Sequence, residues 1–258
     1  LNYENGFGGL VRVDFSQCED IKIIQGGLFM NCRNLKTVVL PPKLDHIFSK
    51  AFYGCVALTS IKLPESLEEI KEQAFYGCEA LTSIELPELL RTIGEEAFCD
   101  CTSLLEINIP QLLIKINEGV FKNCVRLNTV NFNEQVKVIA SEAFLGCTSL
   151  VSIILPKTLN AIQYKVFMRC KSLASIEIPY TVRDIMDHAF CECSALTSIT
   201  FSAGVDDISL EIGDSAFKST SIKKITLPKT LNILNVNAFY QCAELEEVDF
   251  SETQLGFF

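Results

Sequence analysis

Apolar residues recur along the chain at one fixed spacing of 23 residues. A leucine opens each copy of the pattern, and the copies from Leu35 to Ala195 follow one another without an insertion or deletion. The leucines that open successive copies are Leu35, Leu58, Leu81, Leu104, Leu127, Leu150, Leu173 and Leu196. A constant period of this size is the signature of a solenoid, in which each copy forms one turn of a coil.

The order of apolar and polar residues within one copy, Leu58–Cys78, predicts a short strand followed by a turn. The segment from Leu58 through Ile61 to Leu63 ends in strict alternation, which is typical of a half-buried strand. Pro64 has no amide hydrogen to donate to a sheet, so it ends the strand and turns the chain. The second half of the copy has no sustained period, and we interpret it as turns, a short extended piece or one tight helical turn.

A 23-residue copy is too small to bury its own apolar side chains, so neighbouring copies are expected to bury them together in one column. One position of the repeat is always phenylalanine, and its predicted interior column is Phe29, Phe52, Phe75, Phe98, Phe121, Phe144, Phe167, Phe190, Phe217 and Phe239. The strands recur once per copy with the same direction, so they are predicted to pair in parallel. About ten strands at ~4.8 Å spacing give a rod or shallow arc roughly 50 Å long.

The repeat closely resembles one class of leucine-rich repeat, the treponemal or BspA-like type of bacterial and protist surface proteins. The pattern of that class, L-x-x-I-x-L-P-x-x-L-x-x-I-x-x-x-A-F-x-x-C, is matched at almost every position from Leu35 to Cys193. The resemblance implies a repeat solenoid: a right-handed coil, mostly β-structure and turns, with a parallel β-sheet on its concave face. It also implies a secreted or cell-surface location and a role in adhesion.

The whole chain, residues 1–258, is predicted to form a single leucine-rich-repeat domain, because a repeat array counts as one elongated domain. Its expected parts are an irregular N-terminal repeat or cap (10–34), seven regular repeats (35–195), a repeat with an insertion (196–221), terminal repeats (222–250) and a tail (251–258). The tail is expected either to cover the open end of the coil or to mark an arbitrary boundary.

Extra residues interrupt the register within the segment 203–213. The acidic residues Asp206, Asp207, Glu211 and Asp214 suggest a calcium site, but they match no D-x-D-x-D-G loop. We therefore expect a solvated insertion that leaves the coil opposite the main sheet. Strands that end in phenylalanine lack the following proline, and the sequence offers no physical reason for this; they end at Phe15-Ser16, Phe132-Asn133, Phe201-Ser202 and Phe250-Ser251.

Most of the 12 cysteines occupy a single position of the repeat. This column contains Cys32, Cys55, Cys78, Cys101, Cys124, Cys147, Cys170, Cys193 and Cys242. Burial as free thiols is expected, because side chains on adjacent turns point the same way rather than at each other. Cys99-x-Cys101 and Cys191-x-Cys193 look like metal-ligand pairs, but four periods place them roughly 19 Å apart. Zinc needs its ligands within about 2.3 Å, so no metal site is predicted.

The chain carries a formal net charge of −10, with 32 acidic and 22 basic residues. This balance argues against nucleic acid as a partner, because phosphates demand a basic surface. No apolar segment approaches the 18 or more residues of a membrane-spanning helix, so direct membrane insertion is not expected. Residues Leu1–Tyr3 show no signal peptide. The location outside the cell therefore rests on the family resemblance.

Catalysis requires a convergent cluster of unlike residues, and the sequence shows none. His46 and His188 occupy columns of solvent-type residues and lie about six turns apart. There is no G-x-S-x-G, no phosphate-binding glycine loop and no H-E-x-x-H motif. We therefore predict a non-enzyme, with no catalytic residue and no cofactor.

The third and fifth residues of L-x-x-I-x-L are expected to point outward from the sheet, because strand side chains alternate between faces. The third position is mostly serine or threonine, which suit a solvated sheet. The fifth varies from turn to turn, and its predicted ligand-binding residues are Val39, Lys62, Glu85, Asn108, Asn131, Ile154, Glu177 and Thr200. Val39 and Ile154 are apolar where water is expected, which suggests contact with a partner. No aromatic residue occurs in either column, which argues against a sugar-stacking surface.

The leading hypothesis is a non-catalytic interaction module, monomeric and at the cell surface, that binds an extracellular protein or glycan through the concave sheet. A structural spacer without its own ligand is the first alternative. An intracellular repeat protein that binds a partner is the second, and reduced thiols are compatible with it.

Overall fold

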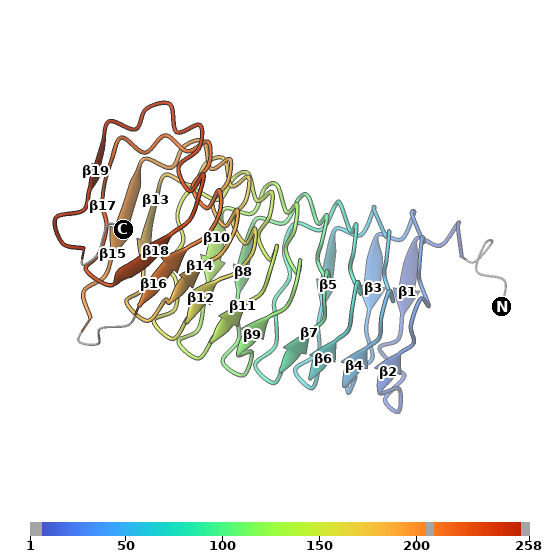
Figure 1. The fold of residues 1–258 in the computed structure, drawn as a ribbon. Helices are drawn as coiled ribbons and strands as arrows, with labels where there is room; N and C mark the ends of the chain where they lie inside the picture. The colour runs from blue at the N-terminus through green and yellow to red at the C-terminus, as the bar shows by residue number, and fades with distance from the viewer. Residues whose placement is uncertain (1–6, 205–208, 254–258) are drawn as a thin grey trace.

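The computed structural model describes residues 7–204 and 209–253, and they form a β-solenoid of about 10 turns. The turns follow one another along a single axis, with the two ends of the chain at opposite ends of the array (Figure 1). All the regular elements in these described residues are short strands, and none is a helix. The repeat solenoid with parallel strands, predicted from the 23-residue period, is confirmed.

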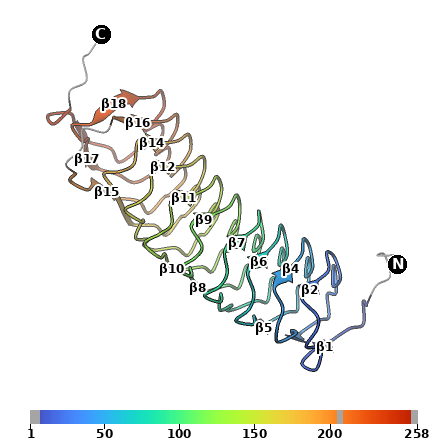
Figure 2. The ribbon, with the colours of Figure 1, turned by 90° about the horizontal axis from the view of Figure 1, so that it is seen from below.

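The L-x-x-I-x-L segments form the strands on one side of the coil, which we call the main sheet (Figure 2). Its strands are β1 (Arg12–Asp14), β3 (Thr37–Val39), β5 (Ser60–Lys62), β8 (Glu106–Asn108), β10 (Thr129–Asn131), β13 (Ser175–Ile178), β15 (Ser198–Phe201), β17 (Lys224–Thr226) and β19 (Glu247–Asp249). In the described chain these strands pair as four separate groups, β1-β3-β5, β8-β10, β13-β15 and β17-β19.

The second half of each turn forms a short extended piece, one of the three alternatives that the sequence left open. These pieces make a second parallel sheet on the other side of the coil (Figure 2). Its strands are β2 (Ile23–Ile24), β4 (His46–Ile47), β6 (Glu69–Ile70), β7 (Thr92–Ile93), β9 (Lys115–Ile116), β11 (Val138–Ile139), β12 (Ala161–Ile162), β14 (Asp184–Ile185), β16 (Leu210–Ile212) and β18 (Leu231–Leu234). The first turn, 10–34, is complete, since it contains both β1 and β2.

A third set of backbone hydrogen bonds, which we call the turn ladder, joins the A-F-x-x-C segments of successive turns. The amides of Gln73, Phe75 and Gly77 donate to carbonyls of the next turn at 2.9, 2.8 and 2.8 Å. The backbone is left-handed at Gln73 (φ 54°) and Gly77 (φ 66°), and the same two positions are left-handed in almost every turn. Two such residues per turn bend the chain sharply enough to bring the segment back towards the main sheet.

The phenylalanine column fills the centre of the coil beside the turn ladder. Rings on adjacent turns stack with centroids 5.2 to 5.8 Å apart and planes within 16° of parallel. Phe52 through Phe217 are fully buried, whereas Phe239 in the last described turn is half-buried. The stacked rings thus form one continuous apolar column.

The cysteine column is bonded to the phenylalanine column of the preceding turn. Eight of the nine thiols in the column donate a hydrogen bond to a phenylalanine carbonyl. The Cys124 Sγ to Phe98 O distance, for example, is 3.2 Å. All 12 cysteines lie in the described chain and are free thiols. Burial raises the pKa of the Cys55 thiol from its ordinary value of 9.0 to about 12, and that of Cys99 to about 12. These thiols are therefore neutral, weakly polar parts of the core.

The extra residues after β15 shift the pairing of the second sheet. Asp184 of β14 lies opposite Glu211 of β16, a separation of 27 residues instead of 23, and the register shifts again between β16 and β18. Glu211 is therefore a strand residue, and its Oε1 accepts a hydrogen bond from Asn235 Nδ2 at 3.0 Å. Asp206 and Asp207, as well as the tail residues 255–258, lie outside the described residues.

Replacing Phe121 by alanine is expected to destabilise the protein by about 3–5 kcal/mol, because its ring stacks on both neighbours in a buried column. Phe239→Ala is the matched control, since Phe239 is half-buried and has one described stacked neighbour, Phe217. The midpoints of urea unfolding, followed by circular dichroism, should fall much further for Phe121→Ala. Equal losses would contradict the dependence of each turn on two neighbours.

Stability is expected to fall steeply as pH rises above about 9. A thiol with a folded-state pKa of about 12 holds its proton where the unfolded chain has lost it. Each such thiol therefore removes about 1.4 kcal/mol per pH unit above the unfolded pKa. Cys55→Ala should lessen the slope of unfolding free energy against pH, whereas Cys18→Ser, at a half-exposed position, should not. A pH-independent stability between 9 and 11 would contradict this account.

Candidate binding face

The outward positions of the main sheet form an exposed surface along the array, which we call the main-sheet face. All eight residues predicted to bind a ligand are exposed on it: Val39, Lys62, Glu85, Asn108, Asn131, Ile154, Glu177 and Thr200. Val39 is 38% exposed and Ile154 is 88% exposed, so the latter projects almost completely into solvent. The two interior columns are buried in the same turns, as predicted. They consist of one phenylalanine per turn, from Phe52 to Phe190, and one cysteine per turn, from Cys55 to Cys193.

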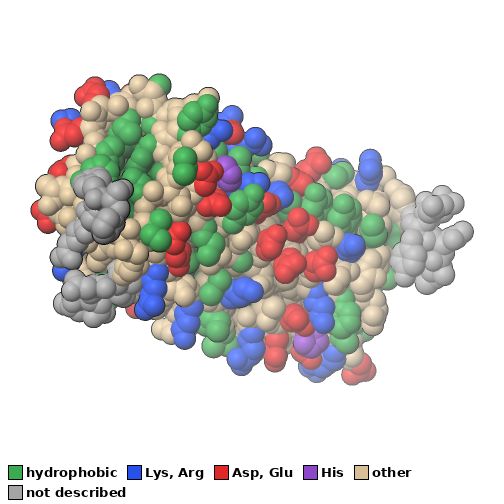
Figure 3. All heavy atoms as spheres, in the orientation of Figure 1, with side chains coloured by type: hydrophobic (Ala, Val, Ile, Leu, Met, Phe, Trp, Pro, Cys, Tyr) green, Lys and Arg blue, Asp and Glu red, His purple; other side chains and the backbone are tan. Residues whose placement is uncertain are grey.

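Polar side chains on the main-sheet face bond to one another along the array. Asn131 Nδ2 donates to Asn108 Oδ1 at 2.7 Å, and Lys224 Nζ lies 2.7 Å from Glu247 Oε2. Acidic and basic side chains both appear along the length of the molecule in the view of Figure 3. The negative net charge is thus distributed over the array rather than gathered into one stripe visible in that view.

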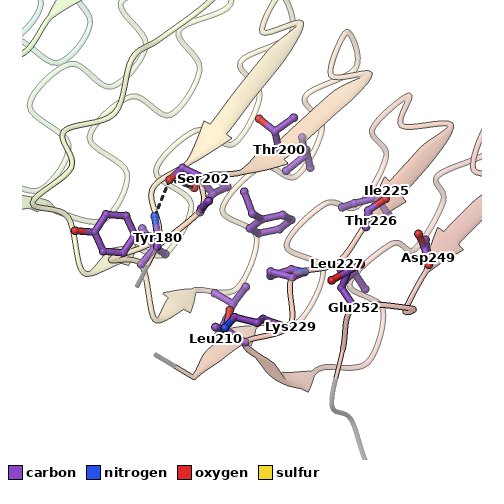
Figure 4. Close-up of a pocket in the computed structure, with 18 of the residues that line it drawn as sticks. Tyr180, Thr200, Ser202, Leu210, Ile225, Thr226, Leu227, Lys229, Asp249 and Glu252 are labelled. Atoms are coloured by element: carbon purple, nitrogen blue, oxygen red, sulfur yellow. Dashed lines mark hydrogen bonds between the residues drawn. The ribbon is translucent and has the colours of Figure 1, made fainter. Parts of the chain in front are cut away.

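A cleft of about 620 Å³ opens at the C-terminal end of the main-sheet face, where the extra residues follow β15. Tyr180 and Ser202 lie on one side of this cleft, and Thr226, Asp249 and Glu252 lie on the other (Figure 4). The Tyr180 amide donates to Ser202 Oγ at 2.9 Å. The sequence signal for this cleft was the insertion, which we interpreted as a solvated loop.

Hydrogen bonds from the Ser251 backbone amide and hydroxyl lower the pKa of Asp249, with a smaller contribution from the Thr226 hydroxyl. The carboxylate is therefore ionised at neutral pH. Together with Glu252 it makes this wall of the cleft acidic, although Lys229 also lines the cleft. The described residues that line the cleft mix hydroxyl, apolar and charged side chains, which suits a polar ligand.

The two histidines lie in different parts of the coil. His46 is in β4, where its Nδ1 lies 3.4 Å from Glu69 Oε2, and His188 packs edge-on against Tyr164 with ring centroids 6.1 Å apart. Among the residues that the structure describes, no three His, Cys, Asp or Glu side chains are placed to hold a metal ion. Within 7–204 and 209–253, no helix is long and apolar enough to cross a membrane.

The sequence matches the BspA type leucine rich repeat region over residues 22–151 and 115–246, with six copies of the repeat. The chain belongs to this family. The resemblance stated from the repeat pattern is thereby confirmed. Comparison with curated proteins gives no match.

Solved structures of bacterial leucine-rich repeat proteins share the fold of this BspA-type protein. A protein from Bacteroides ovatus ATCC 8483 is 26% identical, with a TM-score of 0.67 over 92% of this chain and 63% of its own. A leucine rich cell surface protein from Faecalibacterium prausnitzii A2-165 is 24% identical, with a TM-score of 0.64 over 92% of this chain and 80% of its own. The chain spans less than two thirds of the length of the Bacteroides protein.

Proposed function

We propose that this BspA-type repeat protein is a non-catalytic interaction module, secreted or displayed at a cell surface, that binds a protein through its main-sheet face. The observation that carries the proposal is the contrast between the two sides of each strand. The inward residues are nearly invariant from turn to turn, whereas the exposed fifth residues differ and include Val39 and Ile154.

Stacking explains the constant interior but places no demand on the outward positions. An inward side chain must fit the turns before and after it, while an outward one meets water. Stacking of the turns requires no isoleucine at a position that is 88% exposed, and burying such a side chain against a partner is favourable. The variation along the face is what a surface adapted to one partner requires.

A protein partner fits the face better than a glycan does. The outward columns contain no aromatic side chain on which a sugar ring could stack, and they offer hydroxyl, amide and charged groups beside exposed aliphatic ones. Location at the surface is supported by the likeness to the Faecalibacterium cell surface protein. The repeat itself is a scaffold, so activity must be argued from this face and not from the fold.

Reversing three charges on the main-sheet face is expected to abolish binding without unfolding the protein. The variant combines Lys62→Glu, Glu85→Lys and Glu177→Lys, all at exposed positions. The parent and the variant would be compared on arrays of extracellular-matrix proteins and glycans. We expect a protein hit with the parent that weakens at least tenfold with the variant, because like charges then face each other across the interface.

A second variant with three charge reversals on the opposite side of the coil, Glu68→Lys, Arg91→Glu and Lys137→Glu, serves as the control. It should bind like the parent. The absence of any hit, or a hit that the main-sheet variant retains, would instead favour a spacer without its own ligand.

A further inference from the structure

One turn of the array, residues 150–172, is separated from the preceding turn in both sheets. In the main sheet, the segment Ser152–Leu155 is not a strand, although β10 precedes it and β13 follows it. In the second sheet, β11 and β12 belong to different groups of paired strands. Both sheets are therefore interrupted at this junction. They are also interrupted between the turns that contain β7 and β9, where the main-sheet segment Ser83–Leu86 makes only an isolated bridge to the preceding turn.

The hydrogen bonds missing at this junction can be identified from the neighbouring turns. One turn earlier, Ile109 N donates to Asn131 O at 2.9 Å and Asn128 N donates to Leu105 O at 3.0 Å. The equivalent bonds, from Phe132 N to Ile154 O and from Val151 N to Asn128 O, do not occur in the described chain. The backbone of Ser152–Leu155 makes no hydrogen bond to any described residue on either side.

The turn ladder remains intact where the sheets part. Glu142 N, Phe144 N and Gly146 N donate to the next turn at 3.0, 3.0 and 2.8 Å, and the rings of Phe144 and Phe167 stack at 5.8 Å. The coil is therefore continuous, and the gap affects the two sheets but not the turn ladder.

The turn before the gap carries two unusual side chains. Phe132 directly follows β10 in place of the usual smaller aliphatic residue, and its ring packs edge-on against Phe144 with centroids 6.0 Å apart. Asn133 replaces the usual proline, and its Nδ2 donates to Pro110 O at 2.6 Å and to Leu113 O at 3.1 Å. These bonds hold the end of β10 to the turn before it and leave the following turn without a partner.

A cleft of about 690 Å³ lies between the two turns, lined by residues 128–134 and 152–158. This volume falls within the range of about 300–1,000 Å³ that is typical of ligand sites. Ile154 stands on its rim with 88% of its surface exposed, and Val151 nearby is 55% exposed. The cleft thus combines an unpaired backbone with exposed aliphatic side chains.

We propose that this cleft binds an extended polypeptide segment of the partner, which pairs its backbone with Ser152–Leu155 and packs an aliphatic side chain on Ile154. Free backbone N–H and C=O groups along a strand are a template for another strand, because only a backbone offers donors and acceptors at the same spacing. The inference rests on the proposed function, and it names the partner's segment as extended and apolar. Glu134 and Lys157 contribute opposite charges to the cleft, so a strongly charged segment gains nothing there.

Hydrogen exchange tests the free backbone directly. The amides of Ser152–Leu155 should exchange at least tenfold faster than those of Thr37–Val39, which are paired with β1 and β5 on both sides. Both segments lie on the main-sheet face, so their depth in the coil is matched. Equal protection of the two segments would overturn the proposal.

Peptide selection tests the ligand. A phage-displayed heptapeptide library would be panned on the parent, and the enriched peptides synthesised and measured against Ile154→Asp and Ile114→Asp. Binding should weaken at least tenfold with Ile154→Asp and less than twofold with Ile114→Asp, which places the same change at an exposed isoleucine beside β9 of the second sheet, away from the main-sheet face. Bound peptide should also slow the exchange of the Ser152–Leu155 amides.

Methylating the peptide's own amides distinguishes backbone pairing from side-chain contact. Successive N–H groups of a strand point in opposite directions, so N-methylation at one set of alternate residues should cost at least tenfold and at the other set little. A failure to enrich peptides, equal binding to both aspartate variants, or equal tolerance of the two methylation sets would overturn the proposal. If the triple charge variant still loses the array partner in that case, the proposed function stands while this site does not.

Discussion

The structure depends on the stacking of each turn on the next through the turn ladder and the phenylalanine column beside it. One turn has too few apolar residues for a core, and it becomes stable when a ring from each neighbour covers its own ring. The amides of the A-F-x-x-C segment bond to the following turn at almost every junction, including the two junctions where neither sheet is paired. This side of the coil is the continuous spine to which the sheets are attached.

Because the spine holds the turns together, the sheets can separate locally at little cost. Two of the interruptions in the main sheet follow L-x-x-I-x-L segments whose last residue is phenylalanine, Phe132 and Phe201. The strand ending at Phe15 does not behave this way, since Phe15 N donates to Val39 O at 2.9 Å. The larger ring favours an opening only where the polar residue after it also bonds backward, as Asn133 and Ser202 do.

These bonds also explain why the proline is absent after the phenylalanine. Ser16 N and Ser251 N donate to Asp14 and Asp249 at 2.9 and 2.8 Å, which a proline cannot do. Asn133 and Ser202 use their side chains to reach carbonyls of the preceding turn. A polar residue thus replaces the rigid turn of proline by hydrogen bonds.

The sequence by itself determined the period, the inward columns, the parallel pairing and the outward residues, because each follows from a side chain's place in a repeated unit. It also identified Ile154 as an apolar residue at a solvent-exposed position. The sequence did not distinguish among three possible structures for the second half of each turn, which forms the second sheet. It also did not predict the gap beside Ser152–Leu155. The left-handed backbone positions could not be predicted from the sequence, because Lys50, Gln73 and Glu96 occupy them. Glycine, which favours this conformation, would have indicated them. Only the tertiary structure decided which turns pair, because a backbone hydrogen bond depends on how two turns lie against each other, which the residues of one turn do not fix by themselves.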